Sequence, residues 1–474
     1  MADLLNGFTG FAGRRDDDFE SAGEASRRLQ EALAAGKGVP GPSTDSPIAD
    51  RVLNGAHGRF TAPAHSGIAQ HAAPAQHERR AQPTKRPQPS RAAVAAGADQ
   101  RWAWLEIDLA AIRHNVAETR RYLESRTRLM AVVAADAYGH GAVECSKAMI
   151  GAGADRLAVA TVSEGVELRE AGITAPIVLL EQPPRASIPL LLSHRITPAV
   201  YEPDFAVAYG EMADLHGVMA PYHLAVNTGM NRIGVSFRDA VEFLHQVSFH
   251  RALELEGTFT HFATADNPEM LDFNMALARF DEALASVRAA GFDPGVVHAA
   301  NSAATFRFRE AHFDMVRCGL ALYGIQPCEA TRDRLDIRPA MSVHARVSDT
   351  HVVPMSEGVS YGYSYRSPGS VKICTAPIGF ADGLRRGLSG KIDFIMDGRY
   401  HPQVGEICMS QCMFEIDLRN WRSLSFDPQV GDHVIIVGED GAAQVTIDEL
   451  AEKAKTTPYE MLVGFGQRLT RVYR

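Results

Sequence analysis

Several features that mark common protein classes are missing from this chain of 474 residues. No apolar run approaches the roughly 20 residues that a helix needs to cross a bilayer. The apolar stretch that starts at Met1 runs straight into Arg14, Arg15 and three aspartates, which does not fit a secretory signal. Asp and Glu (57) outnumber Lys and Arg (48), and the net charge of −9 gives no basic footprint for nucleic acid. We therefore expect a cytoplasmic protein that binds neither a membrane nor nucleic acid.

Cysteines are few, and their spacing gives no metal-ligand pattern. The chain has six, and the two that lie closest in sequence are Cys408 and Cys412. A metal site at this pair would need a second pair or nearby histidines, which the sequence does not provide. We expect no metal ion, and we expect the thiols to be reduced as is usual in the cytoplasm.

Large apolar side chains are scarce before residue 100. Residues 36–99 are rich in Pro, Ala, Gly, His, Gln and Arg, and such a segment buries too little surface to offset its ordering entropy. We predict that residues 1–100 form a largely disordered extension. Within it, residues 17–35 would place Leu29 and Leu33 on one face of a helix. The alternatives for this stretch are an isolated, frayed helix and a docking peptide for an unknown partner.

From Trp102 to about Tyr323, strand-like apolar runs alternate with helical patterns. The first predicted strand is Trp102–Asp108, and Asp108 would cap a helix over Leu109–Ser125. Further strands are predicted to start at Leu157, Ile177, His223, Gly257, Val296 and Asp314. This alternation over somewhat more than 200 residues predicts a (β/α)₈ barrel over residues 101–340.

After about Pro339 the helical patterns become rare and short strands with turn signals follow. Such strands are predicted to start at Val371, Asp393 and His433. The fold class is therefore α/β, with the barrel followed by a smaller, mostly β domain over residues 341–474.

Several residues with chemical potential fall where predicted barrel strands end. In such barrels, reactive groups lie on the face where strands end and loops begin. The residues at these positions are Ala134, His261, Asn301, Ser302 and Arg317. A single polar residue after a strand is usually only a loop residue, but several on one face predict a functional site.

The segment Ala131–Gly141, Ala-Val-Val-Ala-Ala-Asp-Ala-Tyr-Gly-His-Gly, resembles the cofactor-lysine signature of the alanine racemases. These pyridoxal 5'-phosphate (PLP) enzymes consist of a barrel and a β domain, and the resemblance extends over roughly Trp102–Arg474. In that family the strand ends on the lysine that holds PLP as a Schiff base. Here that position is Ala134, which has no amine. The resemblance also implies that Tyr138 contacts the cofactor.

Two strings that follow the last two predicted barrel strands, His298–Ala304 and Met315–Gly324, resemble the loops of the family that bind the PLP phosphate. Loops at these positions are the recurrent phosphate site of such barrels. The resemblance places around the phosphate the side chains of Asn301, Ser302 and Tyr459 and the backbone of Gly319 and Leu320. The alternative is a turn and a core strand without a ligand.

The string Val359–Tyr365 matches the one that carries the family's second base, which assigns this role to Tyr361. A tyrosine needs help to act as a base at neutral pH, and His261 with Arg317 resembles the relay that supplies it. Arg317 is implied to face the pyridine nitrogen of PLP, where an arginine does not readily give up a proton. Its alternative role is a structural salt bridge. Because the family's tyrosine comes from the partner subunit, the resemblance implies a homodimer with shared active sites.

The substrate side of the site is implied by two further strings. Arg232 resembles the arginine that binds the substrate carboxylate or a cofactor oxygen, and Met409 would present its backbone N–H to the same carboxylate. The other departures from the family pattern are Ala225, where a lysine that is often carbamylated is common, Ser410, where an aspartate is usual, and Phe380, where a tyrosine is common. Lys147 lies in a predicted helix and is a poor substitute for the lysine missing at Ala134.

Three functions remain open at this stage. The first is a PLP-dependent racemase that interconverts L- and D-alanine or a related amino acid and is impaired because Ala134 replaces the lysine, either by engineering or by divergence. The second is a one-base enzyme that performs transamination or aldol-type cleavage. The third is a non-catalytic PLP-binding protein. In each case PLP would be bound without a covalent link. The β domain argues against the barrel-only PLP-homeostasis proteins, and the lack of a glycine-rich phosphate loop argues against barrel-type decarboxylases.

Overall fold

The computed structural model describes residues 102–332, 334–418, 427–466 and 468–474. The predicted helix over residues 17–35 and the predicted disorder of residues 1–100 lie outside this range. Among the described residues, no helix combines the length and apolar character that crossing a membrane requires.

Eight parallel strands close into a barrel, as predicted. The strands pair in the order β2-β3-β4-β5-β6-β8-β9-β10, and β10 returns to β2, where Arg317 is opposite Met130. Their bounds are β2 (Arg128–Val132), β3 (Arg156–Val159), β4 (Ile177–Leu179), β5 (Ile196–Val200), β6 (Ala220–Asn227), β8 (Leu253–Phe259), β9 (Val296–His298) and β10 (Met315–Cys318). The short β7 (Val235–Ser236) pairs with β6 outside the closed ring. All carboxyl ends of the barrel strands therefore lie at one end.

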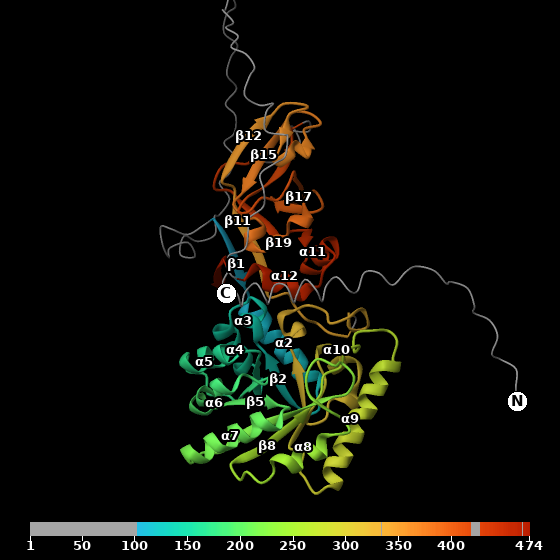
Figure 1. Ribbon diagram of the computed structural model, residues 1–474. Coiled ribbons are helices and arrows are strands. Elements are labelled where there is room, and N and C mark those ends of the chain that lie inside the picture. Colours follow the sequence, from blue (N-terminus) through green and yellow to red (C-terminus); the bar gives the residue numbers. More distant parts are fainter. Residues whose placement is uncertain (1–101, 333, 419–426, 467) are drawn as a thin grey trace, which may run out of the picture. The chain divides into compact units, whose positions relative to one another are not determined.

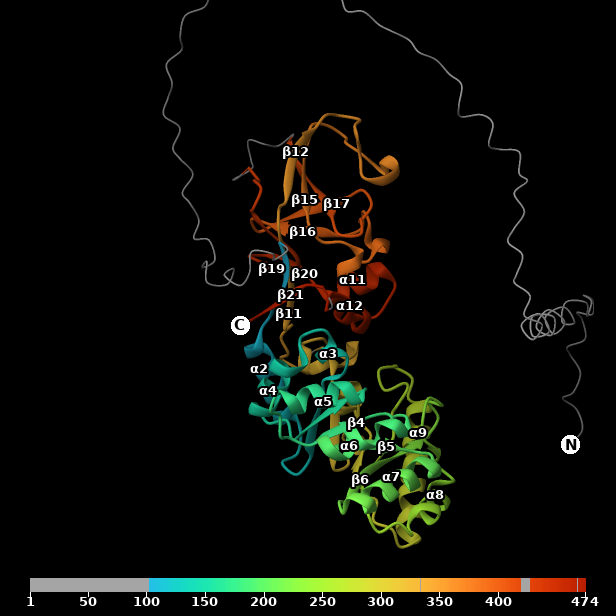
Figure 2. The ribbon, with the colours of Figure 1, turned by 60° about the vertical axis from the view of Figure 1, so that its left-hand side comes forward.

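Helices follow the barrel strands and lie around the sheet (Figures 1 and 2). They are α2 (Leu109–Tyr122), α4 (Ala142–Gly151), α5 (Val162–Glu170), α6 (Ile188–His194), α7 (Pro203–His216), α8 (Ala240–Val247), α9 (Leu271–Ala289) and α10 (Ser302–Arg307). The predicted cap of α2 is confirmed, because Asp108 Oδ1 accepts hydrogen bonds from the N–H groups of Ala110 (2.8 Å) and Ala111 (2.9 Å). Alternate strand residues point into the barrel and toward the helices, as the period of a strand requires.

The second large sheet has ten strands and carries most of the C-terminal region. The order is β12-β15-β18-β17-β16-β19-β11-β1-β21, with β20 beside β19. The bounds are β1 (Ala103–Ile107), β11 (Met341–Arg346), β12 (Asp349–Val353), β15 (Val371–Ala376), β16 (Asp393–Met396), β17 (Arg399–Val404), β18 (Cys412–Asp417), β19 (His433–Asp440), β20 (Ala443–Val445) and β21 (Thr470–Tyr473). The strand predicted at the start of the barrel region, β1, belongs to this sheet and not to the barrel. It pairs with β11, beside which it lies in Figure 1, and with β21.

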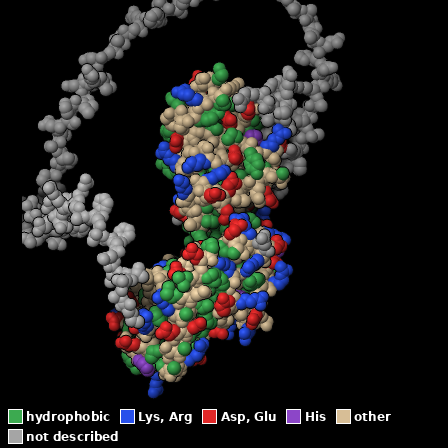
Figure 3. Space-filling view, turned by 90° about the vertical axis from the view of Figure 1, so that its right-hand side faces the viewer, with side chains coloured by type: hydrophobic (Ala, Val, Ile, Leu, Met, Phe, Trp, Pro, Cys, Tyr) green, Lys and Arg blue, Asp and Glu red, His purple; other side chains and the backbone are tan. Residues whose placement is uncertain are grey.

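Smaller elements complete this mostly β domain. They are the two-stranded ribbon β13 (Gly358–Val359) and β14 (Tyr365–Arg366), and the helices α11 (Ile447–Ala454) and α12 (Pro458–Phe465). On the face of the molecule drawn in Figure 3, acidic and basic side chains are interspersed. The surface of that face therefore carries no single-sign charge field.

A left-handed turn follows the first barrel strand. In α3 (Ala134–Tyr138), the residues Ala135, Asp136, Ala137 and Tyr138 have φ values of 52°, 54°, 55° and 53°. A left-handed conformation costs about 1–2 kcal/mol for each residue with a side chain. Such a turn persists only where its surroundings hold it in place.

Two carboxylates and one arginine hold this turn. Glu164 Oε1, in α5, accepts a hydrogen bond from the N–H of Ala135 (2.7 Å). Asp136 accepts from the N–H of Ala142 (2.6 Å) and pairs with Arg471 of β21 (2.5 Å). Arg471 Nε also donates to the carbonyl oxygen of Gly139 (2.8 Å). The turn is thus fixed from both the barrel and the β domain.

The close approach at Gly139 gives a stability test. Gly139 has a φ of +82°, and an added Cβ would lie 2.6 Å from the carbonyl oxygen of Leu462. Gly172 has the same φ of +82° but open space around it. We expect Gly172→Ala to lower the free energy of unfolding by about 1–2 kcal/mol through backbone strain alone. Gly139→Ala should lower it by about 1–3 kcal/mol more, through overpacking. Urea unfolding curves measure both, and equal losses would contradict the clamped position of the turn.

Candidate active site

A small electropositive pocket opens at the carboxyl ends of the barrel strands. Its volume is about 70 Å³, and its walls include Arg232, His261 and Arg317 together with Ala225 and Phe259. No Asp or Glu is among the described residues that line it. Two guanidinium groups without a lining carboxylate favour an anionic ligand.

Arg317 occupies the interior of the barrel with only 3% of its surface exposed. Its Nη1 donates to His298 Nδ1 (2.8 Å), and its Nη2 donates to the carbonyl oxygen of Thr260 (2.7 Å). Burial, reinforced by the charge of Arg232, lowers the pKa of Arg317 to about 9. Among the described residues, the partners of Arg317 are imidazoles and carbonyl oxygens, with no carboxylate paired to it.

The imidazole of His261, which lines the pocket, also contacts Arg317. The distance between His261 Nδ1 and Arg317 Nη2 is 3.2 Å. Burial of the ring, with the charges of Arg317 and Arg232, lowers the pKa of His261 to about 3. The ring is therefore neutral near pH 7, and because arginine only donates, Nδ1 must accept. This tautomer leaves the Nε2 proton of His261 available to a further partner.

The loops after β9 and β10 meet at a hydrogen bond. The N–H of Gly319 donates to Ser302 Oγ (3.0 Å), and the hydroxyl of Tyr138 lies so close to Gly319 that a Cβ there would be 2.3 Å away. The ring of Tyr459, in α12, lies 5.8 Å from the ring of Tyr138. Burial, with Tyr459 nearby, raises the pKa of Tyr138 above its usual range, so its phenol stays a donor. Hydroxyl and backbone N–H donors gathered around a glycine fit a phosphate group.

The other predicted residues of these loops have structural partners. Asn301 caps α10, because its Oδ1 accepts from the N–H of Ala304 (3.0 Å) while its Nδ2 donates to the carbonyl oxygen of Phe262 (3.3 Å). Leu320 is buried and begins the short 3₁₀ helix Leu320–Tyr323. The side chain of Asn301 is thus engaged in local structure, whereas Ser302, Gly319, Tyr138 and Tyr459 are brought together.

Tyr361 and Met409 lie on a different surface, in the β domain. They are 71% and 63% exposed, and neither is among the described residues that line the pocket of Arg317. Tyr363 (64% exposed) and Phe380 (43% exposed) are further large apolar side chains of these loops. Each of these large side chains is thus exposed in the single chain.

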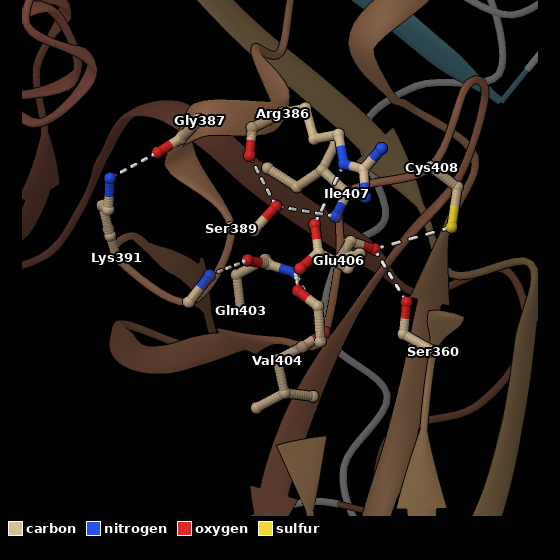
Figure 4. A network of polar contacts seen from close by, with 12 residues as sticks. Ser360, Arg386, Gly387, Ser389, Lys391, Gln403, Val404, Glu406, Ile407 and Cys408 are labelled. Atoms are coloured by element: carbon tan, nitrogen blue, oxygen red, sulfur yellow. Dashed lines mark hydrogen bonds and ion pairs between the residues drawn. The ribbon is translucent and has the colours of Figure 1, made fainter. Parts of the chain in front are cut away.

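A polar network ties the segments of Tyr361 and Met409 together (Figure 4). Ser360 Oγ, next to Tyr361, donates to the carbonyl oxygen of Glu406 (2.9 Å), and Arg386 Nε donates to the Glu406 carboxylate (3.0 Å). The N–H of Ile407 donates to Ser389 Oγ (2.9 Å). The N–H groups of Phe380 and Ala381 donate to the carbonyl oxygens of Cys408 (3.0 Å) and Met409 (2.9 Å). The exposed side chains are therefore presented from a fixed backbone.

Ala134, the position that the family resemblance assigns to the cofactor lysine, lies at the start of the left-handed turn. Ala134 is half-buried and precedes Ala135, whose N–H is held by Glu164. Lys147 lies in α4 and pairs with Glu144 (2.9 Å), away from this role. Glu164 and Arg471 were missed by the sequence analysis. For Glu164 a signal existed, because its spacing from Thr161 fits a capping box.

The neutral buried histidines predict how stability depends on pH. In the unfolded chain a histidine has a pKa of about 6.5, while the pKa is about 4 for His140 and about 3 for His261 and His344. Below pH 6.5 the unfolded chain binds more protons than the folded chain. We expect the stability that these neutral rings contribute to be complete above pH 6.5. The free energy of unfolding should then fall as the pH drops toward 4. His261→Asn should reduce this slope, whereas His351→Asn, at an exposed position, should not. Chemical unfolding at a series of pH values measures the slope, and a flat profile would contradict the neutral state of these rings.

Comparisons with known proteins show the family of this chain. The alanine racemase N-terminal domain matches residues 107–327, and the alanine racemase C-terminal domain matches residues 340–473. The alanine racemase of Synechocystis sp. is 41% identical over 373 residues, which cover 78% of this chain and 98% of the relative. The alanine racemase of Nostoc sp. is 38% identical over 373 residues, covering 78% of this chain and 95% of the relative.

Solved structures agree with the sequence relatives. The crystal structure of alanine racemase from Bacillus anthracis with bound L-Ala-P has a TM-score of 0.74 and 34% identity, covering 80% of this chain and 96% of that one. The histidine racemase of Leuconostoc mesenteroides has a TM-score of 0.72 and 28% identity, covering 80% of this chain and 99% of that one. This chain therefore belongs to the alanine racemase family, whose members are PLP-dependent isomerases.

Proposed function

We propose that this protein binds PLP without a covalent link and racemises alanine or a related small amino acid only slowly. The observation that carries the proposal is the pairing of the donors around Gly319 with the electropositive pocket of Arg317 at one end of the barrel, beside Ala134 in place of the lysine. Donors for the phosphate and cations for the ring and carboxylate would then be present, while the amine would be missing.

The donor set supports a phosphorylated, anionic cofactor. Ser302, Tyr138, Tyr459 and the backbone of Gly319 would hold the phosphate, and Arg317 would face the ring nitrogen. When bound, PLP supplies an electron sink that acidifies the α-proton of an amino acid. Arg232, which is exposed at the mouth of the pocket, would bind the substrate carboxylate with a forked pair of donors.

Racemisation needs a proton removed on one face of Cα and delivered on the other. Tyr361 would serve one face, with the Nε2 proton of His261 and the charge of Arg317 supporting its phenolate. On the other face, the methyl group of Ala134 can neither accept nor deliver a proton. Loss of one acid–base role costs on the order of 10²-fold or more in rate, so we propose a reaction slowed by several orders of magnitude.

The same methyl group favours a second candidate function. With a single base, Tyr361, the protein would be a PLP-binding protein with at most one-sided chemistry, such as transamination or aldol-type cleavage. Release of pyruvate from alanine would support transamination over racemisation. Binding of PLP with no product from either D- or L-alanine would support the non-catalytic alternative.

The assembly that we propose is a cytoplasmic homodimer with shared active sites. Tyr361, Met409, Tyr363 and Phe380 are exposed in the single chain, and a partner barrel would cover them. Tyr361 and the backbone N–H of Met409 would then complete the partner's pocket around Arg317. An isologous pairing of this kind forms two identical sites.

Restoring the amine tests the proposed function directly. We expect Ala134→Lys to raise the racemase rate by at least about 10²-fold and to create a cofactor link that borohydride makes permanent. Ala135→Lys, which adds the same amine one residue further along the turn, should do neither. Chiral analysis of alanine and mass spectrometry after borohydride treatment measure the two effects. If the Ala134 protein already racemises as fast as Ala134→Lys, the proposed role of this position is wrong.

Mixing two inactive variants tests the shared sites. In an Ala134→Lys background, Tyr361→Phe and Arg317→Met should each abolish activity. Random mixing of the two chains should restore about a quarter of the activity, because half of the dimers are mixed and each has one intact site. Each variant mixed with itself is the control. Absence of recovery, with mixed dimers demonstrated by native mass spectrometry, would contradict sites shared between subunits.

A further inference from the structure

A chain of hydrogen bonds continues from Arg317 into the barrel, away from the pocket. Arg317 Nη1 is 2.8 Å from His298 Nδ1. His298 Nε2 is 2.7 Å from Nδ1 of His223, on β6. Both imidazoles are completely buried. The chain thus joins β10, β9 and β6 through the interior of the barrel.

The chain ends at an ion pair. Among the described residues His223 Nε2 has no hydrogen-bond partner: Glu256 Oε2 lies 3.5 Å from it, which is an ion-pair distance and not a formed hydrogen bond. Glu256 Oε1 lies 2.5 Å from Arg156 Nη1. Arg156 is the first residue of β3, so this pair lies toward the amino-terminal ends of the strands. Burial alone would raise the pKa of Glu256, but the polar contacts of its carboxylate with His223 and Arg156 outweigh burial and lower the pKa to about 2.

The backbone at Glu256 departs from regular strand pairing. The pairing of β6 with β8 shifts register, so that Tyr222 is opposite Leu255 while His223 is opposite Gly257. Glu256 is therefore the extra residue of a β-bulge, a feature that redirects a side chain. At Gly257 an added Cβ would lie 2.8 Å from Cε1 of His223, so the ring of His223 uses the space that the glycine leaves.

The order of donors in this chain is fully determined by its two ends. Arg317 only donates, so His298 Nδ1 must accept and His298 Nε2 must carry the proton. That proton points to His223 Nδ1, which must accept in turn, so His223 Nε2 carries the other proton. The ionised Glu256, 3.5 Å away, can accept that proton but cannot donate one. Burial lowers the pKa of both imidazoles, which keeps them neutral.

We propose that Glu256, fixed by Arg156, is a positioning residue for the active site: it sets the tautomers of His223 and His298, so that a lone pair faces Arg317. The proposal rests on the proposed function in that Arg317 is taken to face the cofactor. If the tautomers were reversed, a proton of His298 would point at a proton of Arg317. The guanidinium would then lose one of its partners, while Thr260, Ala299 and His261 would still hold its other nitrogen.

The variant Glu256→Gln tests this order, because it keeps the size of the side chain and leaves one oxygen for two donors. The charged Arg156 should take the amide oxygen, which turns the amide N–H toward His223 Nε2. We expect His223 and His298 to change from the Nε2–H to the Nδ1–H tautomer, measured by ¹⁵N NMR of histidine-labelled protein without added cofactor. In Arg156→Met/Glu256→Gln the amide oxygen is free again, and both rings should return to Nε2–H.

A matched control exists in the β domain. Glu106 also links an arginine and a buried histidine, through Arg474 (2.6 Å) and His344 (3.6 Å). Glu106→Gln should leave the tautomers of His223 and His298 unchanged. A general loss of stability on replacing a buried carboxylate would affect both glutamine variants alike, whereas tautomer reversal is expected only for Glu256→Gln.

Cofactor affinity separates this inference from the proposed function. Glu256→Gln should weaken PLP binding about tenfold, the effect of one lost hydrogen bond to a charged group, and Arg156→Met/Glu256→Gln should recover it. The Nε2–H tautomer persisting on both rings of folded Glu256→Gln would overturn the role of Glu256, whatever PLP does. Reversed tautomers with unchanged PLP affinity would overturn its effect on the site. Failure of the unmutated protein to bind PLP would overturn the proposed function, and with it the link from the tautomers to the cofactor.

Discussion

Burial of one guanidinium inside the barrel sets the requirements that the rest of the site meets. Arg317 is 3% exposed, and a buried cation without acceptors costs several kcal/mol. In the barrel, the acceptors for Arg317 are carbonyl oxygens at the ends of strands and imidazoles that burial keeps neutral. Because each imidazole has only one acceptor nitrogen, the position of every proton around Arg317 follows. The packing of this site and the positions of its protons therefore depend on each other.

In the left-handed turn after β2, contacts from residues far away in the sequence offset the local backbone strain. Four residues with positive φ are stable there because Glu164 holds the turn from the barrel and Arg471 holds it from the β domain. The first loop of the site thus depends on the last strand of the chain. The two domains consequently contribute to one site even within a single chain, before any partner is considered.

The departures from the family pattern affect reacting groups more than supporting ones. Ala134 carries no amine, while Glu164 binds the N–H of the next residue and Tyr138 lies against Gly319. Ala225 lines the pocket with a methyl group in place of a long side chain. A site of this kind separates cofactor binding, which needs donors and shape, from turnover, which needs groups that carry protons.

The sequence by itself determined the elements and the family. Period and apolar runs predicted most of the barrel strands and the cap at Asp108, and short motifs pointed to Ala134, Ser302, Gly319 and Arg317, because local patterns depend only on neighbouring residues. Only the tertiary structure decided which sheet β1 joins, that Asn301 caps a helix, and that Glu164 and Arg471 hold the turn. It also decided the path from Arg317 to Glu256, whose β-bulge arises from pairing between strands. Such contacts join residues far apart in the chain, and a local sequence pattern does not predict which distant residues come together.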